Sequence, residues 1–182
     1  MKKMFFAALT VFIFSCQDEK KESEIVPVTE TPLPEFAYPV DRSHWKIGDP
    51  ANTKMVLDLY HAWDANDANT VAGFFADSAM LDMPNALRVS VNKNNVYEKF
   101  GKARKQYTNT SHKIVSAISL HNDDLHEDWV QILAYNKWAY PDGVRDSMLY
   151  FDNWRLKSGK IEYLNSLEQS PPKPLLKKLE GK

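Results

Sequence analysis

Cysteine is almost absent from this sequence, and so are the usual histidine motifs. Cys16 is the only cysteine among 182 residues, so neither an intramolecular disulfide nor a metal cluster built on several cysteines is possible. The five histidines show no HExxH motif and no other paired spacing. We therefore predict that the protein binds no metal ion and no cofactor.

An excess of charge of either sign is also missing. The sequence has 23 basic and 24 acidic residues and a formal net charge of −1, which predicts no nucleic-acid partner. A hydrophobic content of 43% is that of a globular chain, and the length suits one domain of ordinary size. The five tryptophans and eight tyrosines indicate either a well-packed core or an aromatic-lined cavity.

The apolar run at residues 4–14 is too short for a comfortable membrane-spanning helix. It follows Lys2 and Lys3 and ends at Ser15 and Cys16. Residues 1–16 thus resemble a bacterial lipoprotein signal peptide whose cysteine is acylated; an ordinary secretion signal is the alternative. The resemblance implies a domain anchored to outer-membrane lipid through Cys16, in the cell envelope, either periplasmic or surface-exposed.

The next segment has the composition of a tether. Residues 17–24 are charged and contain no apolar side chain, and residues 25–39 contain four prolines. We predict a largely disordered tether over residues 17–44, because such a segment cannot bury apolar surface. Its start resembles that of surface lipoproteins of the Bacteroidetes group. A folded domain is predicted at residues 45–169, with a loose, proline-containing tail at residues 170–182.

The first half of the domain has helical periodicity. Residues 50–63 place Val56, Leu59, Tyr60 and Trp63 on one stripe, with Asn52 or Thr53 as the cap. Residues 70–77 and 94–107 predict two further helices. Residues 79–83 predict a short strand before Pro84.

The second half alternates between apolar and polar residues, which is typical of strands. Strands are predicted at residues 113–121 and 129–140, and a pair of strands at residues 145–168 turns near residues 157–160. In the first strand, Ile114, Ser116, Ile118 and Leu120 are expected on one face. In the third, Asp152 lies between Tyr150 and Trp154 on one face, where a carboxylate is costly to bury unless it is paired or protonated.

Residues 52–168 resemble the nuclear transport factor 2-like (NTF2-like) superfamily, in its SnoaL-like branch. The segments FFADSAMLDMP (residues 74–84) and FDNWRLKSGKIEYL (residues 151–164) carry the resemblance. It implies an α+β cone in which three N-terminal helices pack against a strongly curved antiparallel sheet around a pocket. The superfamily includes enzymes and members without known catalysis, so the fold alone does not give the function.

Ketosteroid isomerase, a member of this superfamily, offers a specific test. Its alignment puts Met83 where the base aspartate belongs, and Asp82 is expected on the opposite face of the strand. The position of the tyrosine donor falls at Leu59, with Tyr60 about 100° round the helix. Because only Asp152 matches, at the donor aspartate, we predict that the protein lacks this chemistry.

Two sets of site residues follow. The resemblance implies a pocket histidine at His112, which with Asp152 would form an acid–base pair; a solvated strand-end histidine is the alternative. Aromatic side chains are expected either to line the pocket, as ligand-binding residues, or to fill it. These are Tyr60, Trp63, Trp138, Tyr150 and Trp154.

Three functions remain open. The first is a tethered binding domain for a small, partly apolar ligand, without chemistry. The second is a lyase, isomerase or hydrolase that uses His112 and Asp152. The third is a protein-interaction module that forms a homodimer through the open sheet face, with Leu149, Phe151 and Ile161 as anchors.

Overall fold

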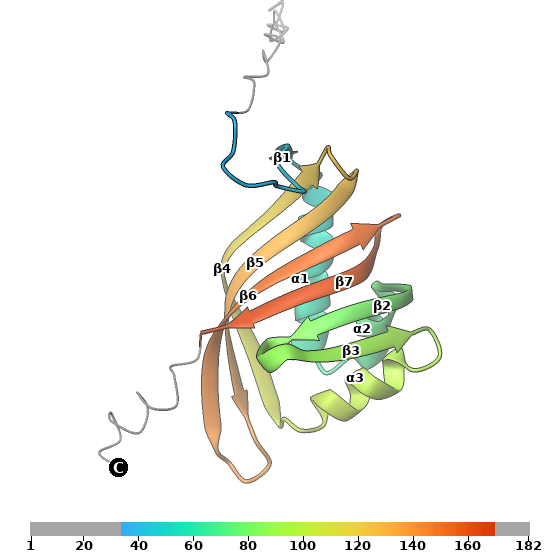
Figure 1. The fold of residues 1–182 in the computed structure, drawn as a ribbon. Helices are drawn as coiled ribbons and strands as arrows, with labels where there is room; N and C mark the ends of the chain where they lie inside the picture. Colours follow the sequence, from blue (N-terminus) through green and yellow to red (C-terminus); the bar gives the residue numbers. More distant parts are fainter. Residues whose placement is uncertain (1–33, 170–182) are drawn as a thin grey trace, which may run out of the picture. The chain divides into compact units, whose positions relative to one another are not determined.

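A computed structural model describes residues 34–169, in which helices pack against one seven-stranded sheet (Figure 1). The predicted signal peptide with Cys16, residues 17–33 of the tether and the tail at residues 170–182 lie outside the described residues. The elements are β1 (Trp45–Ile47), α1 (Pro50–Asp64), α2 (Ala68–Gly73), β2 (Phe75–Met83), the 3₁₀ turn η1 (Pro84–Ala86), β3 (Leu87–Asn92), α3 (Val96–Arg104), β4 (Asn109–Asn122), β5 (Glu127–Ala139), β6 (Arg145–Lys157) and β7 (Lys160–Glu168).

Helix α1 begins at Pro50, as its periodicity predicts, but a different residue caps it. The side chain of Asp49 accepts a hydrogen bond from the Ala51 backbone N at 2.8 Å, so the prediction of Asn52 or Thr53 as the cap is wrong. Proline in the first turn fits this start, because its missing N–H would be unpaired there in any case. The predicted stripe is confirmed, since Val56, Leu59 and Tyr60 are buried.

The segment after α1 differs from its prediction. The helix predicted at residues 70–77 ends at Gly73, and β2 begins at Phe75, where Ile161 of β7 is its pairing partner. Pairing with the sheet outweighs the weak helical preference of so short a segment. Strand β3, which pairs with β2, was not predicted, and the third helix is shorter than residues 94–107.

The sheet is mixed, with the strand order β1-β4-β5-β6-β7-β2-β3. Strands β2 and β7 pair in parallel, and the other neighbouring strands pair antiparallel. The prediction of an antiparallel sheet therefore holds for most of the sheet but not for this pair. Strands β4, β5 and β6 bend strongly, with α1 on one side of them (Figure 1).

A bulge in β4 corrects the predicted faces of that strand. The pairing register with β5 shifts between Ile114 and Ser116. An extra residue reverses the alternation beyond it, so Ala117 packs against the core and Ser119 is buried. Ile118, predicted on the face of Ile114, is 39% exposed on the other side.

The folded domain begins earlier than residue 45. Arg42 donates two hydrogen bonds to the carboxylate of Glu127 at the start of β5, at 2.6 and 3.1 Å. His44 and Ser43 donate their backbone N–H groups to Asp124. The end of the predicted tether therefore belongs to the domain.

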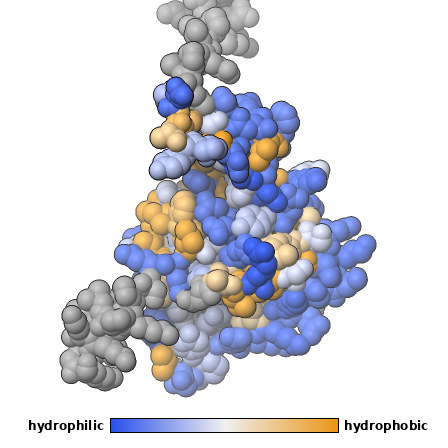
Figure 2. All heavy atoms as spheres, in the orientation of Figure 1, coloured by the Kyte–Doolittle hydropathy of each residue, from blue (hydrophilic) through white to orange (hydrophobic). Residues whose placement is uncertain are grey.

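The core lies between the helices and the inner face of the sheet. Ile132 and Ile161 are fully buried there. Ile161 was predicted on the open face, and that prediction is wrong: it lies opposite Leu156, a buried residue, and opposed residues share a face. Tyr135, Phe151 and the neighbouring Leu167 are on the outer face, where Figure 2 shows apolar patches among hydrophilic side chains. Within residues 34–169, no helix is long and apolar enough to cross a membrane.

Candidate functional site

A cavity of about 220 Å³ lies between the helices and the inner face of the sheet. Its walls come from α1, α2, β2, α3 and strands β4–β7, and most of its lining side chains are aromatic or aliphatic. The main polar groups in the lining are His112, Asn136, Asp152 and Ser166, besides the tyrosine hydroxyls. A mostly apolar wall with a few polar groups is typical of small-molecule sites.

Asp152 is the centre of a buried hydrogen-bond chain. The Tyr60 hydroxyl from α1 donates to Asp152 Oδ2, and the Trp154 indole N–H donates to the Tyr60 oxygen at 3.4 Å. The other carboxylate oxygen, Oδ1, is buried and has no hydrogen-bond partner within the described part of the chain. One oxygen of a carboxylate that is only 8% exposed is thus left unpaired.

Burial dominates the ionisation of this pair. It raises the pKa of Asp152, although the nearby Ser166 hydroxyl, the hydrogen bond from Tyr60 and the charge that His112 carries when it is protonated act in the opposite direction. Burial also raises the pKa of Tyr60 well above its usual value, and the adjacent carboxylate adds to that shift. Both shifts have this direction because a low-polarity environment disfavours the charged form of each group.

His112 is paired with Asp64 and not with Asp152. Its Nδ1–H donates to Asp64 Oδ1 at 2.8 Å, and its backbone N–H donates to Asp64 Oδ2 at 2.9 Å. Thr110 Oγ1 donates to Oδ1 at 3.2 Å. Burial opposes the ionisation of Asp64, but these hydrogen bonds outweigh it and lower its pKa. The carboxylate fixes the tautomer of the imidazole and leaves Nε2 as the acceptor.

The two pairs meet at Tyr60. The ring of His112 lies edge-on to the ring of Tyr60, with centroids 4.7 Å apart, and the hydroxyl of the same tyrosine reaches Asp152. His112 and Asp152 therefore line one cavity but are separated by a ring. The predicted direct acid–base pair is corrected to two neighbouring pairs, Asp64–His112 and Tyr60–Asp152.

Four of the five predicted aromatic residues line the cavity. Tyr60, Trp63, Tyr150 and Trp154 do so, whereas Trp138 lies outside the lining and contacts Tyr107 and Tyr140. Trp138 shares the inward phase of β5, but it lies near the end of the strand. Alternation along a strand predicts which face a residue occupies. It does not predict how far along the strand the residue lies from the cavity.

The sequence interpretation missed Asp64 as a site residue. Asp64 is the last residue of α1 and follows Tyr60 by four positions, which places both side chains on one helix face. The spacing of Tyr60 and Asp64 could have indicated that Asp64 faces the pocket. It was a weak indication, because a carboxylate at the end of a helix is usually solvated.

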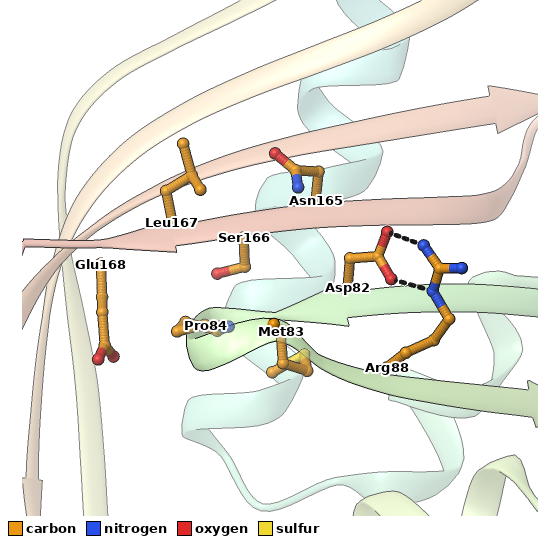
Figure 3. A pocket seen from close by; sticks show the side chains of 9 residues that line it. Asp82, Met83, Pro84, Arg88, Asn165, Ser166, Leu167 and Glu168 are labelled. Atoms are coloured by element: carbon orange, nitrogen blue, oxygen red, sulfur yellow. Dashed lines mark hydrogen bonds and ion pairs between the residues drawn. The ribbon is translucent and has the colours of Figure 1, made fainter.

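The structure corrects the comparison with ketosteroid isomerase at one residue, Tyr60. Tyr60, expected to point away from the donor position, reaches Asp152. Met83 lines the cavity as predicted. Asp82 points to the opposite side and pairs with Arg88 at 2.5 Å (Figure 3). It also accepts a hydrogen bond from Tyr163, and it lines a second hollow that shares Met83 and Ser166 with the cavity. The cavity therefore lacks a base at the isomerase position.

No cluster of three or more metal-ligating side chains occurs among residues 34–169.

Comparisons with known proteins support the fold. No protein-family model matches the sequence, and no curated protein matches it. Many solved structures are similar in fold, and three of them serve as examples. AusH from Aspergillus nidulans has a TM-score of 0.55 at 13% identity, over 70% of this chain and 89% of that one. An epoxide hydrolase of the LEH-like type from M. tuberculosis has a TM-score of 0.54 at 12% identity, over 65% and 82%.

The third structure is a proposed dehydratase of the NTF2-like family from Streptomyces avermitilis. Its TM-score is 0.55 at 10% identity, over 68% of this chain and all of that one. At these identities the likeness establishes the fold and does not extend to substrate or activity. The curved sheet, the helices packed against it and these structures agree: the chain has the NTF2-like fold.

Proposed function

We propose that the cavity binds a small, partly apolar molecule that places a hydrogen-bonding group against Asp152. The observation that carries this proposal is the unpaired Oδ1 of that buried carboxylate, in a cavity lined mainly by apolar and aromatic side chains. Buried polar atoms are nearly always hydrogen-bonded. A bound molecule would supply the missing partner and cover the aromatic walls.

The size of the cavity limits the ligand. Its 220 Å³ are below the range of about 300–1,000 Å³ that is usual for drug-sized ligands. A single-ring compound with one or two polar substituents is therefore a better fit than a fused polycyclic compound.

The test is a thermal-shift titration of the full chain with cyclohexanol, cyclohexanone and cyclohexylamine. We expect at least one of these probes to raise the melting temperature with concentration, since a ligand bound only by the folded state stabilises it. Ser166→Leu, which extends a side chain into the cavity, should abolish the shift, while Ser147→Leu on the exposed part of β6 should keep it. No shift with any probe in the wild type would refute the proposal.

A second candidate function is acid–base catalysis by a lyase, isomerase or hydrolase. It is favoured by the Asp64–His112 pair, which orients an imidazole beside the cavity, with no hydrogen-bond partner for Nε2 among residues 34–169. In this proposal Nε2 takes up a proton from the bound substrate, and the Asp64 carboxylate stabilises the resulting imidazolium. Tyr60 and Asp152 hold a hydrogen-bonded proton on the other side of the ring.

This candidate is tested with His112→Gln and Asp64→Asn against a panel of epoxides, hydroxy ketones and enones. Turnover of one of them by the wild type, reduced about 10²–10⁴-fold by His112→Gln, is the expected result. His121→Gln, at a histidine that pairs with Asp128 outside the cavity, should leave the rate unchanged. Binding without turnover would reject the catalytic candidate and retain the binding one.

We also propose that the domain is anchored in the bacterial cell envelope through an acylated Cys16. The support is the sequence alone: a basic start, an apolar run and the only cysteine at its end. Metabolic labelling with an alkyne fatty acid should tag the full chain, and Cys16→Ser should remove the label. A labelled Cys16→Ser protein would contradict the proposal.

A further inference from the structure

The cavity offers hydrogen-bond acceptors that have no donors. Of the polar atoms in its lining, Asp152 Oδ1 and Asn136 Oδ1 are buried without a hydrogen-bond partner in the described part of the chain. Tyr60 donates to Asp152 Oδ2 and Trp154 donates to Tyr60, so neither of these donors serves Asp152 Oδ1. A ligand that pairs the two open oxygens must therefore bring donors of its own.

The cavity also lacks a positive charge to match Asp152. Lysine and arginine are absent from its lining residues. Arg104 is buried at this end of the domain, but its guanidinium donates to the backbone carbonyls of Trp63, Asp64 and Tyr107. His112 directs its Nδ1–H to Asp64. A carboxylate that is 8% exposed thus has no ion pair within residues 34–169.

The aromatic walls add a second feature that favours a cation. Trp63, Phe75, Phe100 and Tyr107 line the cavity together with Tyr60, Tyr150 and Trp154. A cation over the face of such a ring is attracted by its quadrupole, by about 0.5–2 kcal/mol. An ammonium group supplies several donors, carries positive charge and suits aromatic walls, and it is small enough for this cavity.

The two unpaired acceptors are separated along the sheet. Ile132 of β5 lies opposite Asp152, and Asn136 lies four residues further along the same strand, opposite Met148. Four residues span roughly 13 Å of strand, which the bend of the sheet shortens on its inner face. The two acceptors therefore meet different ends of a ligand, not the same atom.

We propose that the cavity selects a small protonated amine, whose ammonium donates to Asp152 Oδ1, with a hydroxyl or second N–H at the far end of the molecule donating to Asn136 Oδ1. This inference rests on the proposed binding function and names the chemical class of its ligand. It differs from recognition of a ketone or an enolate, because neither of these groups can donate a hydrogen bond to Asp152 Oδ1. The ligand class is thus small amino alcohols or diamines on an apolar skeleton.

Isothermal titration of the full chain with matched probes tests the inference. Cyclohexylamine should bind at least about tenfold more tightly than cyclohexanol and cyclohexanone, because its hydrogen bond to the carboxylate is charge-assisted. Asp152→Asn, which keeps the shape and the acceptor for Tyr60, should remove this preference. Asp146→Asn, at an exposed carboxylate on the same strand, should keep it.

The far end is tested with trans-4-aminocyclohexanol. It should bind more tightly than cyclohexylamine to the wild type, and Asn136→Leu should remove only this additional gain. If Asp152→Asn does not fold, the affinities of the wild type for cyclohexylamine and cyclohexanol still show whether the cavity prefers an amine. An alcohol or ketone that binds as tightly as the amine overturns the inference and leaves the binding function standing, whereas no binding by any of the four probes overturns both.

Discussion

The two faces of the sheet treat a carboxylate beside aromatic rings in opposite ways. On the outer face, Glu127 accepts hydrogen bonds from Arg42 and from the Trp129 indole, and pairs with Arg155 at 3.0 Å. These partners lower the pKa of Glu127 to about 2, the hydrogen bond from Arg42 most of all. On the inner face, Asp152 has one donor and no ion pair in the described chain, and burial raises its pKa.

The difference separates a structural carboxylate from a candidate functional one. The guanidinium of Arg155 lies 5.7 Å from the ring centroid of Trp129, and it forms a second ion pair, with Glu162. Each charged side chain of this outer cluster has a counter-charge within the described residues, so the cluster needs no ligand to balance its charge. The inner site carries an unmatched acceptor at a cost in stability, and such a cost is common where a protein reserves a group for a ligand.

The largest effect expected from a change on either face comes from the core. Ile161→Ala should lower the free energy of unfolding by about 2–5 kcal/mol, because it leaves a void at a fully buried position. Ile118→Ala, the same change on the outer face at a 39% exposed position, should cost below about 1 kcal/mol. Urea unfolding measures both; equal losses would contradict the assignment of faces.

The next largest effect is expected when the ion pairs of Glu127 are removed. Glu127→Gln should lower the free energy of unfolding at pH 7 by about 1–2 kcal/mol, a range that allows for screening by solvent. The folded pKa of about 2 lies below the ordinary value of 4.5, so the stabilisation is complete above pH 4.5 and is lost as the pH falls toward 2. The difference between variant and wild type should therefore shrink over that window. A difference constant from pH 7 to pH 2 would exclude the ion pair as its source.

The unpaired carboxylate should give a smaller effect of opposite sign. The folded pKa of Asp152 is raised, so the wild type is most stable below the ordinary pKa of 3.8 and loses stability as the pH rises through the folded pKa. Asp152→Asn does not titrate. The stability of the variant relative to the wild type should thus increase with rising pH, by up to about 1 kcal/mol at pH 8. Thermal melts from pH 3 to pH 8 measure this difference. A variant whose relative stability decreases as the pH rises would contradict the raised pKa of Asp152.

The smallest effect on stability concerns the apolar part of the outer face. We propose that Phe151, which is 37% exposed next to Leu167 and Leu133 in the pairing register, contributes to a homodimer through this face. Phe151→Ser should change the unfolding free energy of the monomer by about 0.5 kcal/mol or less. It should also shift the sedimentation of the full chain from dimer to monomer. A wild type that sediments as a monomer at all concentrations would reject the dimer.

Strand alternation predicted much of the inner face of the sheet. It placed Asp152 and Trp154 on one side of β6, and both are buried. It failed in β4, because the bulge after Ile114 reverses the alternation, and at Ile161, whose face follows from its partner in β6. Bulges and pairing partners depend on the neighbouring strand, so a single strand sequence does not report them.

The site was predicted in part. His112 and Asp152 do line one cavity, but the partner of each comes from α1, as Asp64 and Tyr60. Which residue of a helix meets which strand depends on the rotation and position of the helix over the sheet. Side-chain spacing within α1 shows that Tyr60 and Asp64 share a face, yet it does not show what that face meets.

The sequence by itself determined the longer elements and the inner positions of most strands, because burial of one face imposes a local period on side chains. The tertiary structure decided the parallel pairing of β2 with β7, the exchange of partners at His112 and the unpaired oxygen of Asp152. These features arise from contacts between segments far apart in the chain. Distance in the sequence carries no signal for such contacts until the elements are packed.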